Sequence, residues 1–163
     1  MRYTRRGLTT AIALLALVSP AAAQQPQSEE ELTVEARQQR ITAQIDDMAD
    51  LLGQEAMFPW LQLFTGRLPE GGAERITLSL DQDRDWEIVG VCDQACPNLD
   101  LALYGRDDEM LVEDRLPDDI PLLAVTTRAP GSFQLEIIMS ECESDFCMWG
   151  VRPFSRRSGG LRD

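Results

Sequence analysis

The second half of the chain alternates apolar and polar positions with the two-residue period of a β-strand. From Phe133 to Met139 every second residue is apolar, so one face of this segment would be buried and the other exposed. Residues 99–104 repeat the pattern with three leucines. Residues 86–92 instead carry apolar side chains on both faces, which predicts an inner strand with both faces covered.

Short apolar segments of this kind recur after Pro59 and are separated by turn-forming residues. The separating stretches PEGG, DQDRD, GRDDE, LPDD and APGS are rich in Gly, Pro and Asp, which favour tight turns. This spacing predicts an all-β fold, an antiparallel β-sandwich or jelly roll of about eight strands. The predicted strands are residues 60–68, 75–80, 86–92, 99–104, 110–113, 122–127, 133–141 and 148–154.

The segment before the predicted strands has apolar residues spaced with the period of a helix. Ser28 begins an S-x-x-E capping box, and apolar residues then follow at steps of three and four, which predicts one amphipathic helix that ends near Gly53. We favour an interpretation in which this seam packs on the strand domain or frays. The alternative is weak self-association as a short coiled coil, which about three heptads and one polar position disfavour. The seam comprises Val34, Gln38, Ile41, Ile45, Met48 and Leu52.

The first 23 residues have the pattern of an export signal. Three arginines precede an apolar run at residues 11–18, and alanines at residues 21–23 suit cleavage after Ala23. The apolar run is shorter than the roughly 20 residues of a membrane-spanning helix, so we expect no membrane span after cleavage. The paired arginines leave the twin-arginine route open beside the general export route, which we favour.

These patterns divide the chain into four parts. Residues 1–23 are the signal peptide, and residues 24–57 are a flexible leader and the amphipathic helix. Residues 58–154 are the β-sandwich domain, and residues 155–163 are a disordered tail. Cleavage leaves 140 of the 163 residues, enough for one domain with its own core.

The charge balance narrows the choice of partners. The chain has 28 acidic and 15 basic residues and a net charge of −13, and loss of the three arginines of the signal lowers this to −16. Such a surface repels phosphate backbones and anionic lipid headgroups, which argues against nucleic-acid and membrane-surface binding. It suits a protein of the periplasm or the extracellular space.

The absence of histidine and lysine restricts catalysis. Without them the chain lacks Ser-His and Cys-His nucleophiles, imidazole metal ligands and Schiff-base chemistry. A pair of carboxylates can still act as in glycoside hydrolases, but no pair stands out by its position in the sequence. We therefore expect a protein that is not an enzyme, with a small carboxylate-dependent hydrolase as the alternative.

The four cysteines occur in two close pairs, Cys92 with Cys96 and Cys142 with Cys147. Disulfides persist in exported proteins, and four cysteines allow three connectivities. Each pair flanks a loop between two predicted strands, which brings its members together without help from the rest of the fold, so we favour local pairing. A four-thiolate zinc site is the less favoured alternative, because the spacings are not C-x-x-C.

The stretch from about residue 67 to residue 154 carries the motifs NLDLALY, a later PDD-x-P, PGSFQLEI and a closing strand with an aromatic residue and a glycine. In these motifs it resembles the bacterial pre-peptidase C-terminal domains, which are small β-sandwiches usually appended to secreted peptidases. The resemblance implies the same sandwich fold here. Asn98 stands where the motif has its first acid, so Asp100 is the one acid left of that pair.

The resemblance also implies a calcium site, because related domains in some secreted proteases bind calcium through acids at strand ends. It maps this role onto Asp100, with Asp114, Asp118 and Asp119 as candidate companions from neighbouring loops. Carboxylates held close together repel one another, and a hard divalent cation with oxygen ligands relieves that repulsion. Apart from calcium we expect no cofactor.

The sequence thus favours an exported interaction module over an enzyme. Such a sandwich would present loops or an edge strand to an envelope or extracellular protein or to a polysaccharide. A further alternative is an inhibitor-like protein that contacts its partner through the N-terminal helix. Trp60, Trp86 and Trp149 can stack on sugars, but Trp86 and Trp149 lie in predicted strands where burial is expected.

Overall fold

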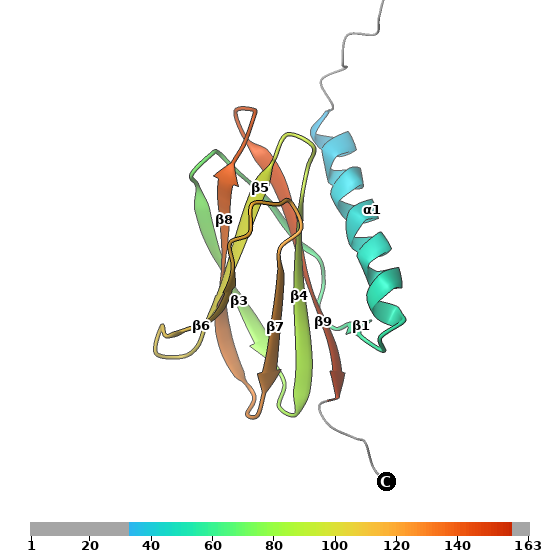
Figure 1. Cartoon of the computed structure of the whole chain (residues 1–163), viewed down its shortest axis with the longest axis vertical. Coiled ribbons are helices and arrows are strands. Elements are labelled where there is room, and N and C mark those ends of the chain that lie inside the picture. The colour runs from blue at the N-terminus through green and yellow to red at the C-terminus, as the bar shows by residue number, and fades with distance from the viewer. Residues whose placement is uncertain (1–32, 158–163) are drawn as a thin grey trace, which may run out of the picture. The chain divides into compact units, whose positions relative to one another are not determined.

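The computed structural model describes residues 33–157, which form one helix and two antiparallel sheets (Figure 1). Sheet A has the strand order β1-β9-β4-β7, with β2 also paired to β9, and sheet B has the order β3-β8-β5-β6. This confirms the predicted β-rich fold with one helix. The elements are α1 Val34–Gly53, β1 Phe58–Pro59, β2 Phe64–Leu68, β3 Ala73–Leu80, β4 Arg84–Cys92, β5 Asn98–Tyr104, β6 Met110–Asp114, β7 Leu122–Thr127, β8 Gly131–Glu141 and β9 Cys147–Arg157.

One cluster of buried apolar side chains joins the two sheets. Sheet A contributes Trp86 and Ile88 of β4 and Trp149 of β9, and sheet B contributes alternate residues of β5 and β8. These side chains are fully or almost fully buried, which confirms the expected burial of Trp86 and Trp149. Trp60 differs, because 42% of its surface is exposed and the guanidinium of Arg84 lies 3.5 Å from its ring centroid.

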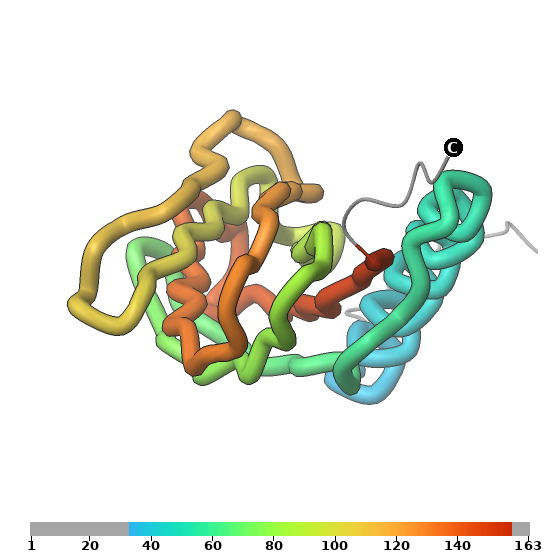
Figure 2. Tube along the Cα trace, turned by 90° about the horizontal axis from the view of Figure 1, so that it is seen from below, coloured from blue at the N-terminus to red at the C-terminus, as the bar shows by residue number. Residues whose placement is uncertain are grey.

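The opposite face of sheet A is covered by α1. Ile41 and Ile45 of the helix lie in a second buried cluster with Val89 and Val91 of β4 and Phe154 of β9. In Figure 2 the helix lies along one side of the sheets, beside β9. β4 is therefore buried on both faces, as the sequence of residues 86–92 predicts.

The helical seam thus packs on the strands, which confirms the favoured interpretation. Full burial of each isoleucine contributes about 1.5–3 kcal/mol, so the helix is firmly attached. Coiled-coil self-association would need the same face, which Ile41, Ile45 and Leu52 already bury in sheet A. The helix and both sheets belong to one compact unit. The proposed domain boundary at residue 58 stays a prediction.

The helix begins later than the capping box at Ser28 predicts. Thr33 is the N-cap, and its Oγ1 accepts a hydrogen bond from the backbone N of Ala36 at 3.2 Å. A threonine hydroxyl satisfies an otherwise unpaired N–H of the first turn as well as a serine does, so a second cap downstream sets the start. Ser28 itself lies outside the described residues.

Most strands extend a residue or two beyond the predicted bounds, and the largest differences are at two places. The segment 60–68 contains a break, with β1 before it and β2 at its end. β9 continues to Arg157, so the prediction that the disordered tail begins at residue 155 is wrong. The reason is backbone pairing with β4, where Ser155 lies opposite Trp86, together with a hydrogen bond from Arg84 Nη1 to Ser155 Oγ at 3.2 Å.

The remaining predictions for the chain ends lie outside the described residues. These are the signal peptide at residues 1–23, the leader that follows it, and the tail from residue 158 onward. Within residues 33–157 no helix is both long enough and apolar enough to cross a bilayer.

Close contact between α1 and sheet A depends on Gly150. This residue of β9 lies opposite Val91, on the face that the helix covers, and a Cβ atom at this position would overlap Cγ2 of Ile41. A side chain here would therefore push the helix away from the sheet. Gly53, in the last turn of the same helix, has no atom within 4 Å of the corresponding position.

We predict that Gly150→Ala lowers the free energy of unfolding by about 1–3 kcal/mol, because overpacking forces the helix or the strand to shift. Ile41→Ala alone should also destabilise the protein, but Gly150→Ala should cost less in that background than in the parent, since the clashing methyl group is absent. Gly53→Ala is the matched control and should leave stability unchanged or slightly higher. Chemical denaturation of the parent, the two single variants, the double variant and the control measures this, and a Gly150→Ala protein as stable as the parent would contradict the packing described.

Candidate functional site

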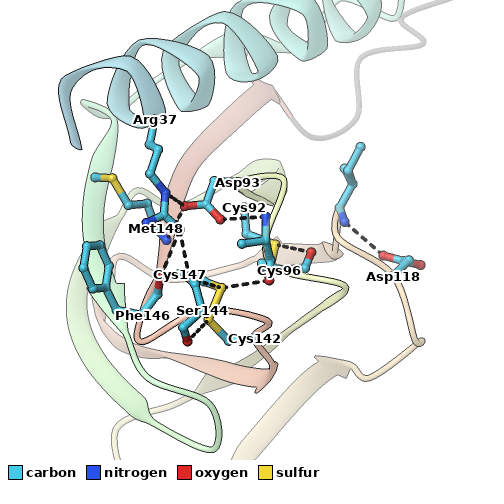
Figure 3. The surroundings of a disulfide bond; sticks show 12 residues. Arg37, Cys92, Asp93, Cys96, Asp118, Cys142, Ser144, Phe146, Cys147 and Met148 are labelled. Atoms are coloured by element: carbon cyan, nitrogen blue, oxygen red, sulfur yellow. Dashed lines mark hydrogen bonds and ion pairs between the residues drawn. A yellow bond between two sulfur atoms is a disulfide. The ribbon is translucent and has the colours of Figure 1, made fainter. Parts of the chain in front are cut away.

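Two disulfides lie at one end of the sheets (Figure 3). Cys92 is bonded to Cys96 and Cys142 to Cys147, which is the local connectivity predicted. The two closed loops touch each other, because the backbone N of Glu143 donates to the carbonyl of Ala95 at 2.7 Å. Such disulfides are compatible with an oxidising compartment.

A buried ion pair joins the helix to both disulfide loops (Figure 3). Asp93, 2% exposed, accepts from Arg37 Nε at 2.7 Å and from the backbone N of Met148 at 2.8 Å. Arg37 Nη2 also donates to the carbonyl of Phe146 at 3.0 Å and to Ser144 Oγ at 3.2 Å. The backbone N of Ala95 donates to the other carboxylate oxygen at 3.2 Å, so both oxygens of Asp93 have donors and this carboxylate has a structural role.

We predict that Arg37→Met destabilises the protein by about 2–4 kcal/mol, because it leaves the Asp93 carboxylate buried without its cation. Arg40→Met is the matched control. Arg40 lies on the same helix and donates to Gln94 Oε1 at 2.8 Å in an exposed position, so its loss should cost less than about 1 kcal/mol. Thermal unfolding of both variants tests this, and equal losses would contradict the role assigned to Arg37.

The outer face of sheet B carries a polar network. Tyr104 Oη donates to Glu136 Oε2 at 2.9 Å, and this hydrogen bond raises the pKa of the tyrosine. Arg75 donates to Glu136 Oε1 at 3.1 Å, which raises the pKa of the guanidinium, and it lies 4.4 Å from the centroid of the Tyr104 ring. These groups meet because β8, which carries Glu136, is paired with β3 on one side and with β5 on the other.

Asp100 lies beside this network and is 5% exposed. Its Oδ2 accepts from Ser140 Oγ at 2.6 Å and lies 3.5 Å from Arg115 Nη1. Arg115 also pairs with Glu113 at 2.6 Å, and that hydrogen bond raises the pKa of Arg115. Asp100, Glu113 and Glu136 are therefore each engaged with a cation in the folded protein.

Two of the other predicted calcium ligands, Asp114 and Asp118, stabilise a loop, and the third, Asp119, is exposed. Asp114 accepts from the backbone N of Leu116 at 3.1 Å and from that of Leu122 at 2.9 Å, so it ties the end of β6 to the start of β7. Asp118 Oδ1 accepts from the backbone N of Ile120 at 3.1 Å. Residues 33–157 contain no group of three or more acidic or cysteine side chains arranged to hold a metal ion. Calcium binding at these positions stays a prediction.

The predicted calcium site can be tested by a thermal scan with calcium. If Asp100 and its companions bind calcium with the weak affinity of extracellular modules, 10 mM calcium should stabilise the protein by about 1 kcal/mol or more, and magnesium should not. Asp100→Ala should abolish the shift, whereas Asp107→Ala, an exposed acid outside the predicted set, should keep it. No calcium-specific shift at about 10 mM would remove the hypothesis.

The largest concentration of exposed apolar side chains lies along β6, β7 and the segment 115–121 that joins them, which we call the β6–β7 edge. Five of the nine large apolar side chains exposed in the described residues are found here. In Figure 2 this part of the chain lies on the side opposite to α1. The five are Met110, Leu111, Leu116, Ile120 and Leu122.

The β6–β7 edge is also acidic. Residues 106–122 contain seven acidic residues and two arginines, a net charge of −5. Sequence reasoning identified the acids of this segment but missed its exposed apolar component. The available signal was that its leucines and isoleucine interrupt the acids without a two-residue period, so they do not belong to one buried strand face.

A hollow of about 450 Å³ lies at the far end of the sheets, where the β3–β4 turn approaches the end of β9. Two arginines and two aspartates contribute to its wall, so its charge selects neither an anion nor a cation. The lining residues are Asp81, Gln82, Asp83, Arg84, Pro130 and Arg157.

No family model matches the chain, and no curated protein matches it. The resemblance to pre-peptidase C-terminal domains therefore stays a prediction that rests on the motifs of residues 67–154.

Proposed function

We propose that this chain is an exported, non-catalytic β-sandwich module that binds a protein of the cell envelope or the extracellular space. The single buried cluster shared by sheets A and B supports the sandwich architecture. The two disulfides support the proposal that the protein resides in an oxidising compartment. The net charge of −13 argues against nucleic acid as the partner.

The observation that carries the proposal is the exposed apolar set on the β6–β7 edge. Exposed apolar side chains gathered on one element and bordered by polar residues mark protein interaction sites. Leu116 is 63% exposed and Met110 is 52% exposed, although the core beside them is well packed. Exposing them in water is unfavourable, and a partner surface would bury them.

A protein is favoured over a polysaccharide as the partner by the type of these side chains. Sugars are usually held by flat aromatic faces together with planar polar groups, whereas the β6–β7 edge offers leucine, isoleucine and methionine. The most exposed tryptophan, Trp60, already has Arg84 stacked at 3.5 Å from its ring centroid. An inhibitor-like role of α1 is disfavoured because its apolar face is buried in sheet A.

The test is site-specific photo-crosslinking in the native envelope. A photoreactive residue in place of Leu116 should give one protease-sensitive adduct, and the adduct should fall when excess unlabelled protein competes. The same residue in place of Ser79, exposed on β3 at the other edge of sheet B, is the control and should give none. No adduct from Leu116, or equal adducts from both sites, would contradict a binding role for the β6–β7 edge.

A further inference from the structure

The edge strands of the two sheets differ in how they are protected. Exposed edges normally carry charges, prolines or bulges, because unpaired backbone groups otherwise recruit another strand. β3 carries Glu74 and Arg75, β2 carries Arg67, β1 contains a proline, and β6 ends in two acids and has a register shift against β5. β7, with the sequence LLAVTT, has neither charge nor proline. Among the described edge strands it is the one open to pairing.

The orientation of the β7 backbone follows from one hydrogen bond. The backbone N of Leu122 donates to Asp114 Oδ2 at 2.9 Å, so this N–H points away from β4, the strand to which β7 is paired. Backbone groups alternate in direction along an antiparallel strand, so those of Ala124 and Thr126 point away from β4 as well. Within residues 33–157 no strand pairs with β7 on that side.

Carboxylates lie next to this free edge on the outer face of sheet A. Glu87 of β4 is the register partner of Ala124, and Asp85 is the partner of Thr126. Asp85 accepts from Thr126 Oγ1 at 2.9 Å and pairs with Arg156 at 3.4 Å, so Glu87 is the carboxylate available to a basic ligand. Glu87 forms no ion pair within the described residues. Burial, and then the charge of Glu55, raises its pKa, while the charge of Arg156 lowers it, so the ionised form of Glu87 is only partly compensated. A basic side chain of a bound segment, lying across the small Ala124, would supply the missing positive charge next to Glu87.

The inner face of the same edge is apolar. Val125 of β7 and Val112 of β6 are half-buried and pack against the cluster between the sheets. A strand added to β7 would thus place alternate side chains against an apolar surface and against carboxylates. The segment 106–122, with its net charge of −5, adds to the attraction for cations and opposes pairing with a second copy of the chain.

We propose that the free edge of β7 receives an extended segment of a partner protein as an added strand of sheet A, and that this segment alternates basic and apolar residues. The inference rests on the proposed function and specifies its partner. Main-chain hydrogen bonds to Ala124 and Thr126 provide the affinity. The basic side chains on the face of Glu87, and the apolar ones facing Val125, provide the selectivity.

The experiment uses the full chain and a synthetic probe, a capped peptide of four Arg-Val repeats. A peptide of Glu-Val repeats and one with the same arginines and valines in block order serve as controls. The alternating basic peptide should bind at least about tenfold more tightly than either control. Amide hydrogen exchange should show new protection at Ala124 and Thr126 on binding, which a purely electrostatic association would not produce.

Variants at Ala124 separate the backbone contribution from the charge contribution. Ala124→Pro removes an N–H that faces solvent, a position where edge strands tolerate proline, so the protein should fold but lose at least about tenfold in affinity. Ala124→Arg should weaken binding by a similar factor, and Ala124→Glu should not. Val125→Pro is the contrast for folding, because it removes an N–H directed at β4 and should destabilise the protein.

The outcomes divide clearly. A peptide that binds without protection of Ala124 and Thr126, or equally well to the Pro, Arg and Glu variants, would overturn strand addition. Failure of all three peptides to bind would overturn it too, as would concentration-dependent self-association abolished by Ala124→Pro, which would identify a second copy as the occupant. If the Leu116 crosslink forms and the variants at Ala124 leave it unchanged, the proposed function stands and this inference fails.

Discussion

The structure depends on the burial of sheet A from both sides. β4 and β9 carry apolar side chains on each face, so the sheet needs sheet B against one face and α1 against the other. Without the helix, Val89, Val91 and Phe154 would be exposed in the middle of the sheet, an apolar surface that a monomeric protein rarely presents to water. The position of the helix in turn depends on the small Gly150, which lets Ile41 reach the sheet.

The strands were predictable because their signal is local. Alternation along residues 133–139 and the two-faced pattern of residues 86–92 each reflect which side chains a strand buries, and the structure places both as expected. The cysteine pairs were predictable for the same reason, since their members are four and five positions apart. The helix start was less well predicted, because Ser28 and Thr33 are both acceptable caps and the sequence does not rank them.

The contacts that the sequence does not reveal join residues far apart in the chain. Arg37 and Asp93 are 56 positions apart, and nothing in either neighbourhood marks them as partners. The acids of residues 106–122 were visible, but whether they gather around an ion or cap a loop depends on where backbone N–H groups lie, as for Asp114. The open edge of β7 likewise follows from strand order, which short apolar segments do not encode.

The two short disulfide loops have a consequence for how the chain matures. A bridge between residues so close in sequence closes with little loss of chain entropy, so each native pair is also the pair that meets most often in the unfolded chain. Oxidation can therefore precede folding and still give the native bonds, without isomerase-assisted reshuffling of wrong pairs. The carboxylate of Asp93, next to Cys92, is then already fixed in a closed loop when the helix docks and delivers Arg37.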